Sequence, residues 1–371
     1  MNIILIILFG TYLIFSIMSL FGFLRPNKHL SIQKVTDTEN QNLISIIVPF
    51  RNEANRIHEL LSSLQKQSKT SVIKEIIFVD DHSTDRSSEV VEKWTHKSNY
   101  KTKIIALSEG EGKKHAIHFG VLYSTAPYVL LLDADVNFEC DFMQKLADNN
   151  FSFNELILIP VVETSGLVWS RITSYVLSVI TIGMARLNLP ILANGAGLLF
   201  DRAAYLDSNP FSDNFDISSG DDLFLLEAFT RKYKVRAISP KSLFIETRGA
   251  ISYREFIERS LRWSGKMKHI RLPLTNFFGS VVLLVNLSVV PIAILFILKF
   301  SILNLLLLSA KCIVDIMLLS AAIRHYKSHL LLLYTIPMLF LYPLSMLLVL
   351  FLNVFNYKNQ WKNRLVLNSK S

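Results

Sequence analysis

Cysteine is scarce in this chain of 371 residues, which contains only Cys140 and Cys312. The two lie far apart, and Cys312 falls within an apolar segment. This argues against a disulfide framework and against a cysteine-ligated metal centre. It is also typical of a protein that resides in a reducing cytoplasm.

Recognition signals for nucleic acid are missing as well. The chain has no zinc-binding spacing and no aromatic ribonucleoprotein pattern. The loop from Gly110 to Lys114 lacks the Gly-x-x-x-x-Gly-Lys-Ser/Thr spacing of a P-loop. The net charge of +9 therefore points to anionic lipid or a phosphorylated substrate, with no nucleic-acid partner expected.

Apolar residues are abundant and make up 51% of the chain. The segment from Ile3 to Leu24 is nearly all apolar and has the length of about 20 residues that a bilayer-spanning helix needs. A cleaved signal peptide would begin with basic residues, whereas here Arg25 follows the segment. Residues 1–25 are therefore predicted to form an uncleaved transmembrane anchor whose basic end lies in the cytoplasm.

A second membrane region is predicted over residues 273–371, which include a basic tail. Its three apolar segments are Phe277 to Leu298, Ile302 to Ile323 and Leu330 to Phe355. Lys311 and Asp315, four residues apart, can pair inside the bilayer, and a part in lipid or sugar passage is the alternative. Pro337 and Pro343 can make the last segment re-entrant, which leaves the side of the C-terminal tail open.

Between the membrane regions, residues 26–272 are predicted to form one α/β domain. Short β-branched runs that predict strands alternate with segments of helical spacing. The strands are expected at 44–48, 75–79, 103–107 and 128–132, and the helices at 52–67, 87–94 and 113–124. This alternation predicts a doubly wound, mostly parallel sheet, in which ligands bind at the carboxyl ends of the strands.

Acidic pairs follow two of these strands. Asp80 and Asp81 either form a turn, with Ser83, Thr84 and Asp85 capping the next helix, or accept hydrogen bonds from the base or ribose of a nucleotide. Asp133 and Asp135, two residues apart, predict a site for Mg²⁺ or Mn²⁺. Such a metal would bridge the phosphates of a donor and stabilise a leaving diphosphate.

Two further segments carry small or basic residues. In the glycine-punctuated loop before residue 114, backbone amides and Lys113 either face phosphate or form a solvated turn. Asn194 and Gly195 lie in a run of small residues, which permits close approach of a ligand. We interpret this run as a wall of an acceptor site, with an ordinary turn into a strand as the alternative.

The last two motifs combine charge with helical spacing. Asp221 and Asp222 precede a helical stretch, where they either favour the helix dipole or supply a general base. Arg259, Arg262 and Trp263 lie on a basic helix predicted from 253 to 269. One interpretation is that this helix lies on the membrane surface. The other is that Arg262 contacts a diphosphate and Trp263 contacts a sugar. The two interpretations are compatible.

Taken in order, these motifs resemble those of the GT-A, family 2 inverting glycosyltransferases. The resemblance runs from Leu43 to Ile270. The matching residues are Pro49, Asn52 and Glu53 for Pro-x-x-Asn-Glu, Val79 to Asp85 for Val-Asp-Asp-Gly-Ser-x-Asp, Asp133 and Asp135 for Asp-x-Asp, Asp221 and Asp222 for Glu-Asp, and Arg259, Arg262 and Trp263 for Gln/Arg-x-x-Arg-Trp. The chain departs from the pattern at His82, where the family has glycine.

The resemblance implies a GT-A, Rossmann-like domain between transmembrane helices, most similar to ceramide glucosyltransferase and to the cellulose, hyaluronan and poly-N-acetylglucosamine synthases. Asp222 would be the base, the metal would be Mn²⁺ or Mg²⁺ held by Asp135 and Asp133, and Arg262 would neutralise the leaving diphosphate. The donor nucleotide would meet Pro49, Glu53, Asp80, Asp81, Lys113 and Asp133. The acceptor would meet Asn194, Gly195, Asp221, Arg259 and Trp263.

The resemblance also implies the partners and the place of the reaction. The donor is expected to be a nucleotide sugar, UDP-linked, and the acceptor a lipid or a lipid-linked glycan. The protein would be integral to the membrane, the plasma membrane if bacterial, with its catalytic domain in the cytoplasm. The alternatives are a processive polysaccharide synthase and a catalytically silent membrane scaffold or transporter component.

Overall fold

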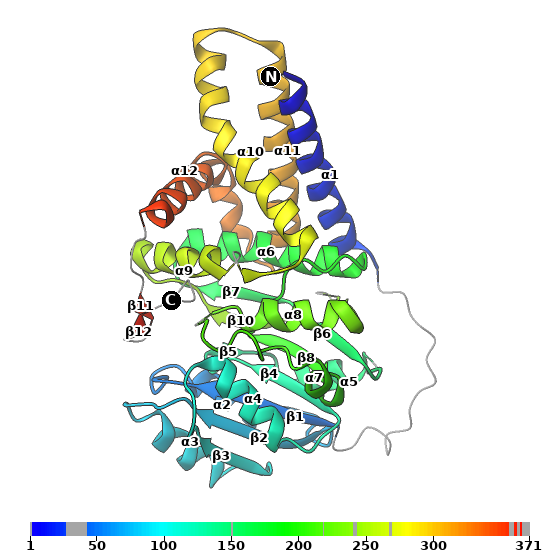
Figure 1. Ribbon diagram of the computed structural model, residues 1–371, viewed down its shortest axis with the longest axis vertical. Coiled ribbons are helices and arrows are strands. Elements are labelled where there is room, and N and C mark those ends of the chain that lie inside the picture. The colour runs from blue at the N-terminus through cyan, green and yellow to red at the C-terminus, as the bar shows by residue number, and fades with distance from the viewer. Residues whose placement is uncertain are drawn as a thin grey trace. The chain divides into compact units, whose positions relative to one another are not determined.

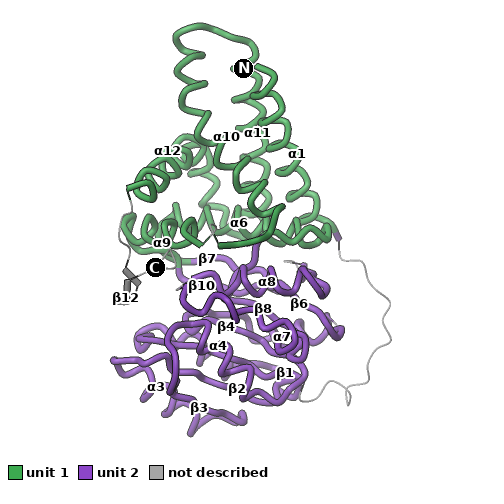
Figure 2. Tube along the Cα trace, in the orientation of Figure 1, with its two compact units in different colours: residues 1–25, 165–191, 249–360 green, residues 26–164, 192–248, 361–371 purple. Residues whose placement is uncertain are grey.

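The chain forms two compact units, each built from separate stretches of sequence (Figure 2). Unit 1 gathers residues 1–25, 165–191 and 249–360, and unit 2 gathers residues 26–164, 192–248 and 361–371. The computed structural model describes residues 2–26, 43–149, 151–217, 219–239, 243–266 and 269–355, and the backbone of 360–361 and 364–365. The predicted basic tail lies mostly outside the described residues.

A seven-stranded sheet forms the centre of unit 2 in the part of the chain that the structure describes, with the order β3-β2-β1-β4-β8-β6-β9 (Figure 1). Its strands are β1 (Ile44–Phe50), β2 (Ile73–Asp80), β3 (Thr102–Ala106), β4 (Tyr128–Leu132), β6 (Glu155–Leu158), β8 (Gly197–Asp201) and β9 (Lys234–Ala237). β1 pairs in parallel with β2 and β4, whereas β8 runs antiparallel to β4 and β6. The predicted α/β fold with a mostly parallel sheet is confirmed.

Six helices and a small sheet complete the described part of unit 2. The helices are α2 (His58–Gln65), α3 (Ser87–Thr95), α4 (Lys113–Tyr123), α5 (Phe142–Ala147), α7 (Arg202–Ser208) and α8 (Asp221–Lys232). The small sheet has the order β5-β10-β7, from β5 (Val136–Asn137), β10 (Ile245–Arg248) and β7 (Val161–Ser165). Two short strands, β11 (Gln360–Trp361) and β12 (Arg364–Leu365), lie near the C-terminus.

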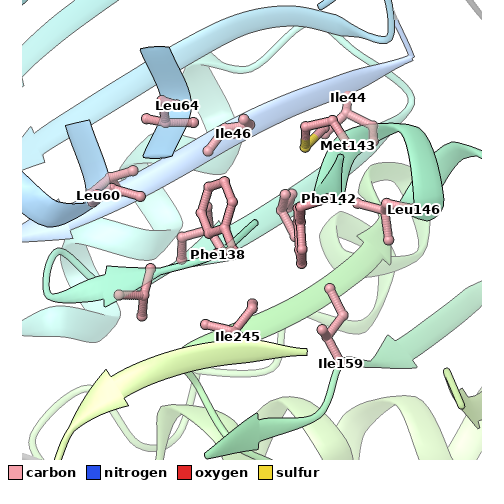
Figure 3. Packing of buried hydrophobic residues seen from close by; sticks show 14 of the residues in the cluster. Ile44, Ile46, Leu60, Leu64, Phe138, Phe142, Met143, Leu146, Ile159 and Ile245 are labelled. Carbon is pink, nitrogen blue, oxygen red and sulfur yellow. The ribbon is translucent and has the colours of Figure 1, made fainter. Parts of the chain in front are cut away.

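The hydrophobic core of unit 2 packs α2 against the central sheet (Figure 3). Leu60 and Leu64, one helical turn apart, are fully buried and belong to the same cluster as Ile46 of β1 and Phe138. Residues at i and i+4 lie on the same helix face, so α2 presents one apolar stripe to the core. This packing holds the chain that leaves β1 at the carboxyl edge of the sheet.

The helix that was predicted to begin at residue 52 begins instead at His58. Asn52 adopts a left-handed backbone with φ of 52°. Its N–H donates to Ser83 Oγ at 3.1 Å, and its side-chain oxygen accepts from the Thr84 N–H at 2.8 Å. Hydrogen bonds between Asn side chains and backbone groups compete with helix formation, and here the bonds of Asn52 join the end of β1 to the loop after β2.

A buried carboxylate network joins β1 and β2 at their amino ends and makes a pH-dependent contribution to stability. Glu75 is fully buried and accepts hydrogen bonds from Ser45 Oγ at 3.0 Å and Thr125 N–H at 2.8 Å, and it pairs with Lys103 Nζ at 2.8 Å. Burial alone would raise the pKa of Glu75, but the hydrogen bonds from Lys103, Thr125 and Ser45 lower it to about 2.

Folding therefore favours the ionised form of Glu75, and its contribution is present above pH 4.5 and is lost as the pH falls toward 2. The depression corresponds to about 3 kcal/mol. Between pH 4.5 and 2, the free energy of unfolding should fall by about that much more in the wild type than in Glu75→Gln, as measured by denaturant titration. Parallel pH profiles of the two proteins would contradict this prediction.

Unit 1 is rich in long apolar helices. The helices of its described part are α1 (Asn2–Leu24), α6 (Val168–Arg186), the charged α9 (Tyr253–Lys266), α10 (Pro273–Leu298), α11 (Ile302–His325), the short 3₁₀ helix η2 (His329–Tyr334) and α12 (Thr335–Val354). Among the described residues, five segments are long and apolar enough to cross a membrane, namely α1, α6, α10, α11 and the continuous η2–α12. The predicted anchor and the three C-terminal segments are thus confirmed as helices, and α6 is an additional candidate.

Close helix packing joins α6 to the anchor helix α1, although α6 runs across the direction of α1, α10 and α11 (Figure 1). A Cβ on Gly22 would lie 2.0 Å from the carbonyl oxygen of Gly183, and one on Gly183 would lie 1.9 Å from that of Ser19. Small residues allow such approach between helices in membranes. Arg186 also donates to the carbonyl oxygens of Gly22 and Phe23, which satisfies groups at the end of α1.

Candidate active site

All of the predicted donor-site residues except Lys113 lie at or just after the carboxyl ends of β1, β2 and β4. β1 lies between the other two, and in its pairing with β2 Pro49 is opposite Val79 and Phe50 is opposite Asp80. Asp133 follows the last residue of β4. The structure thus brings three predicted motifs, namely Pro49 to Glu53, Asp80 with Asp81, and Asp133, to one edge of the sheet, as expected for an α/β fold.

The two aspartates after β2 differ in their surroundings. Asp80 accepts from the Ser83 N–H at 2.9 Å and from the Ser88 hydroxyl, so its carboxylate stabilises the turn and the start of α3. Glu53 contributes to the same region through its backbone N–H, which donates to Ser87 Oγ at 2.7 Å. The turn interpretation of Asp80 is therefore present in the structure, whereas the N-cap residue of α3, Arg86, makes no side-chain capping hydrogen bond.

Asp81 instead points to the loop before α4. It is buried, and its Oδ1 accepts from the Gly112 N–H at 2.9 Å. Arg51 Nη1 donates to the Asp81 carbonyl oxygen at 2.8 Å. Gly112 has φ of 97°, a left-handed value that favours glycine, and it is the residue from which α4 starts. Asp81 thus holds the glycine-punctuated loop against the end of β2.

His82 occupies a position whose backbone suits glycine. Its φ is 58°, its ring is about half exposed, and Nδ1 lies 3.3 Å from Asp81 Oδ1. A left-handed conformation costs an L-residue roughly 1–2 kcal/mol. At this position, where the family has glycine, the chain therefore carries a residue with a strained backbone, and its ring lies next to the buried Asp81.

His82→Gly is expected to raise the free energy of unfolding by about 1 kcal/mol, because glycine adopts this backbone without strain. The matched control is His96→Gly, since His96 is exposed and ends α3 with φ of −64°. That change should lower stability by about 0.5–1 kcal/mol. Thermal unfolding of both variants tests the prediction, and a loss of stability in His82→Gly would refute it.

Lys113, in the first turn of α4, joins two of the predicted acidic motifs. Its Nζ lies 2.6 Å from Asp133 Oδ1 and 2.9 Å from Asp221 Oδ2. Burial alone would lower the pKa of Lys113, but the charges of Asp133 and Asp221 raise it above its ordinary value. The lysine therefore stays protonated and links the end of β4 to the start of α8.

Gly195 lies against this ion-pair cluster. A Cβ at this position would come within 2.6 Å of Asp221 Oδ2 and 3.0 Å of Lys113 Nζ. Asn194 is exposed, and its Oδ1 accepts from the Ala196 N–H at 3.1 Å. The segment predicted as an acceptor wall is therefore adjacent to Asp221, and a side chain at 195 would displace the ends of the Asp221 and Lys113 side chains.

The carboxylates of this cluster suit a hard divalent cation. Burial raises the pKa of Asp133, the charges of Asp135 and Asp221 raise it further, and the Lys113 ammonium opposes both. Three mutually repelling carboxylates beside one ammonium leave excess negative charge, and oxygen donors suit Mg²⁺ or Mn²⁺. Within the described residues, no group of three or more His, Cys, Asp or Glu side chains is arranged to hold a metal. The carboxylate oxygens of Asp133 and Asp135 have the chemistry that such a cation prefers, but Lys113 already pairs with Asp133, and the metal site stays a prediction.

Asp222 is half-buried in the first turn of α8, after Gly220 with φ of 93°. Its Oδ1 accepts from the Leu223 N–H at 2.8 Å. The two acids of this motif therefore differ, because Asp221 faces Lys113 while Asp222 caps its own helix. The assignment of the general base to Asp222 stays a prediction.

The Arg-Trp motif lies on α9 in unit 1. Arg259 pairs with Glu255 at 3.6 Å, and Trp263 is 37% exposed. Arg262 is half-buried, and burial together with the charge of Arg259 lowers its pKa to about 10. A desolvated guanidinium beside another cation favours an anionic ligand. The catalytic roles of these three residues stay predictions.

Sequence reasoning overlooked Lys114, which is buried and donates to two backbone carbonyl oxygens. The sequence did contain a signal for this buried lysine. Residues at i, i+3 and i+7 fall on one helix face, so Lys114 shares a face with the apolar Ile117 and Val121, which are fully buried. A lysine on that stripe indicates a buried ammonium with a structural partner.

Comparisons with known proteins find similarity to glycosyltransferases. A family model described as glycosyl transferase family 2 matches residues 45–175. The 4,4'-diaponeurosporenoate glycosyltransferase of Staphylococcus haemolyticus is 34% identical over 124 residues, which is 31% of this chain and 30% of that protein. The poly(ribitol-phosphate) beta-N-acetylglucosaminyltransferase of Staphylococcus aureus is 28% identical over 209 residues, 55% of this chain and 35% of that protein. The chain thus spans about a third of the length of these curated relatives.

A solved structure extends the likeness in fold. The mannosyltransferase from Pyrobaculum calidifontis, in complex with GDP-Man and Mn²⁺, superposes with a TM-score of 0.60 at 15% identity, covering 96% of this chain and 99% of that one. At this identity the likeness concerns the fold alone. The family model matches the stretch from β1 into α6, and the superposition over nearly the whole chain agrees with the predicted GT-A fold.

Proposed function

We propose that the protein is a membrane-bound inverting glycosyltransferase that moves a sugar from a UDP-linked donor to a lipid or lipid-linked glycan. The observation that carries the proposal is the Lys113 bridge, at 2.6 Å to Asp133 and 2.9 Å to Asp221. It joins the predicted donor side of the site to its predicted acceptor side. The five apolar helices support a membrane location and hence a lipid-anchored acceptor.

Each residue of the site has a defined role in this proposal. A divalent cation held by Asp133 and Asp135 would neutralise the donor's diphosphate. Asp222, in the first turn of α8, takes the proton from the acceptor hydroxyl as that oxygen attacks the anomeric carbon. Gly195 lies against Asp221 and Lys113, and its lack of a side chain lets these two groups meet there.

Three further residues complete the proposal. Asp81 positions the loop whose amides face the nucleotide. We assign Arg262 to the leaving diphosphate and Trp263 to the acceptor sugar, following the resemblance. The catalytic domain would face the cytoplasm, because a basic residue, Arg25, follows the anchor helix.

The test is transfer by the purified full-length chain in native lipid extract, supplied with labelled UDP-glucose, UDP-N-acetylglucosamine or GDP-mannose and with Mn²⁺ or Mg²⁺. The proposal expects label in a lipid-soluble product with one UDP-sugar. Label in a long water-soluble polymer would instead identify a processive synthase. Failure to bind or turn over any donor would leave a silent scaffold as the better account.

A further inference from the structure

The ammonium of Lys114 is buried in unit 2 and holds a loop rather than a ligand. Lys114 is 4% exposed, and its Nζ donates to the carbonyl oxygens of Asn214 at 2.7 Å and Ile217 at 2.6 Å. The same nitrogen lies 4.4 Å from the ring centroid of Phe224 in α8. Carbonyl dipoles and an aromatic face both stabilise a cation, which offsets the cost of removing it from water.

The loop that Lys114 holds leads directly to the acidic pair. Asn214 and Ile217 belong to the connection between α7 and α8, and α8 begins at Asp221. The next residue of α4, His115, contacts the same connection, because its ring stacks on that of Phe215 at 4.3 Å between centroids. The position of the α8 amino end is therefore set by several contacts with α4.

Two successive lysines at the start of α4 interact unfavourably with the helix dipole. The amino end of a helix favours anions, and a cation there is unfavourable; the first turn of α4 contains no acidic residue. Both lysines are nevertheless engaged with the region around α8. Lys113 pairs with Asp133 and Asp221, and Lys114 binds the preceding loop.

We propose that Lys114 is a positioning residue, which holds the 209–217 loop so that Asp221 and Asp222 are aligned with Lys113 and Asp133. The catalytic consequence rests on the proposed function, whereas the loop contact is a property of the fold. Misplacement of a reacting group by about 1 Å can cost about 10²-fold in rate. Loss of the clamp should therefore lower the rate of transfer while leaving donor affinity, which depends on the edge of the sheet, nearly intact.

The experiment compares Lys114→Met, which removes the ammonium but keeps an apolar stem, with Lys93→Met, the same change at an exposed site on α3. In the full chain, Lys114→Met should raise amide exchange across 209–217 by at least tenfold. It should lower kcat by about 10²-fold and change the KM for the donor by less than about threefold. Lys93→Met should change none of these quantities.

A second variant guards against misfolding of Lys114→Met. Phe215→Leu removes the stacking on His115 and keeps an apolar residue. It should lower kcat by a smaller factor than Lys114→Met does, again with little change in the KM for the donor. Wild-type exchange across the loop, or raised exchange with wild-type kcat, would overturn the inference. A wild type that transfers no sugar would refute the proposed function, and the exchange comparison would then still decide whether Lys114 clamps the loop.

Discussion

Asp222→Asn is expected to lower the kcat of sugar transfer by about 10²–10⁴-fold, the range that loss of a general base produces. Asparagine has nearly the same shape and keeps an oxygen that can accept the Leu223 N–H, which Asp222 now binds at 2.8 Å. The fold and the affinity for the nucleotide should therefore remain. The measurements are steady-state transfer and equilibrium binding of the nucleoside diphosphate.

The adjacent acid supplies the matched control. Asp221 pairs with Lys113 at 2.9 Å, so Asp221→Asn removes a charge from the cluster without removing the proposed base. We expect it to raise the KM for the donor or the metal requirement more than it lowers kcat. If Asp221→Asn abolished transfer and Asp222→Asn retained it, the base would have to be reassigned to Asp221.

The second large effect concerns unit 1. Lys311→Met is expected to destabilise the protein by about 3–5 kcal/mol, because it leaves a charged partner without compensation in an apolar setting. Lys311 is 3% exposed and pairs with Asp315, which also accepts from the Tyr12 hydroxyl at 2.5 Å. The pair thus links α11 to the anchor helix α1, and we expect the two helices to separate more readily when the pair is lost.

A double variant distinguishes a compensating pair from a functional site. Lys311→Met with Asp315→Leu removes both charges and should recover most of the lost stability. Lys299→Met, at the exposed end of α10, is the control and should be nearly neutral. Thermal unfolding in lipid nanodiscs measures all of these variants. If the double variant were as unstable as the single one, the account of Lys311 and Asp315 as mutual partners would be wrong.

The sequence predicted the parts of the fold that depend on local pattern. The apolar runs of β1 and β4 predicted strands, and the end of the second run correctly placed Asp133 directly after a strand. The start of α2 was misplaced, because the left-handed Asn52 binds the loop after β2. Its partner there is 31 residues away, and helical spacing does not reveal such a contact. Long-range hydrogen bonds override propensity in such cases.

Tertiary contacts account for what was missed. The pairing of Lys113 with Asp221 joins residues from different elements of unit 2, and no spacing rule predicts it. The apolar character of α6 was overlooked because Arg171 and several hydroxyl residues interrupt the run. Only its close packing on Gly22 makes its partnership with α1 clear.

The most direct test of the account is metal-dependent release of nucleoside diphosphate from a UDP-sugar by the full chain in lipid, with Asp135→Asn assayed in parallel. The account predicts turnover with Mn²⁺ or Mg²⁺, loss of turnover with chelator, and a strongly weakened metal response in Asp135→Asn. Equal turnover by both proteins in the presence of chelator would contradict it.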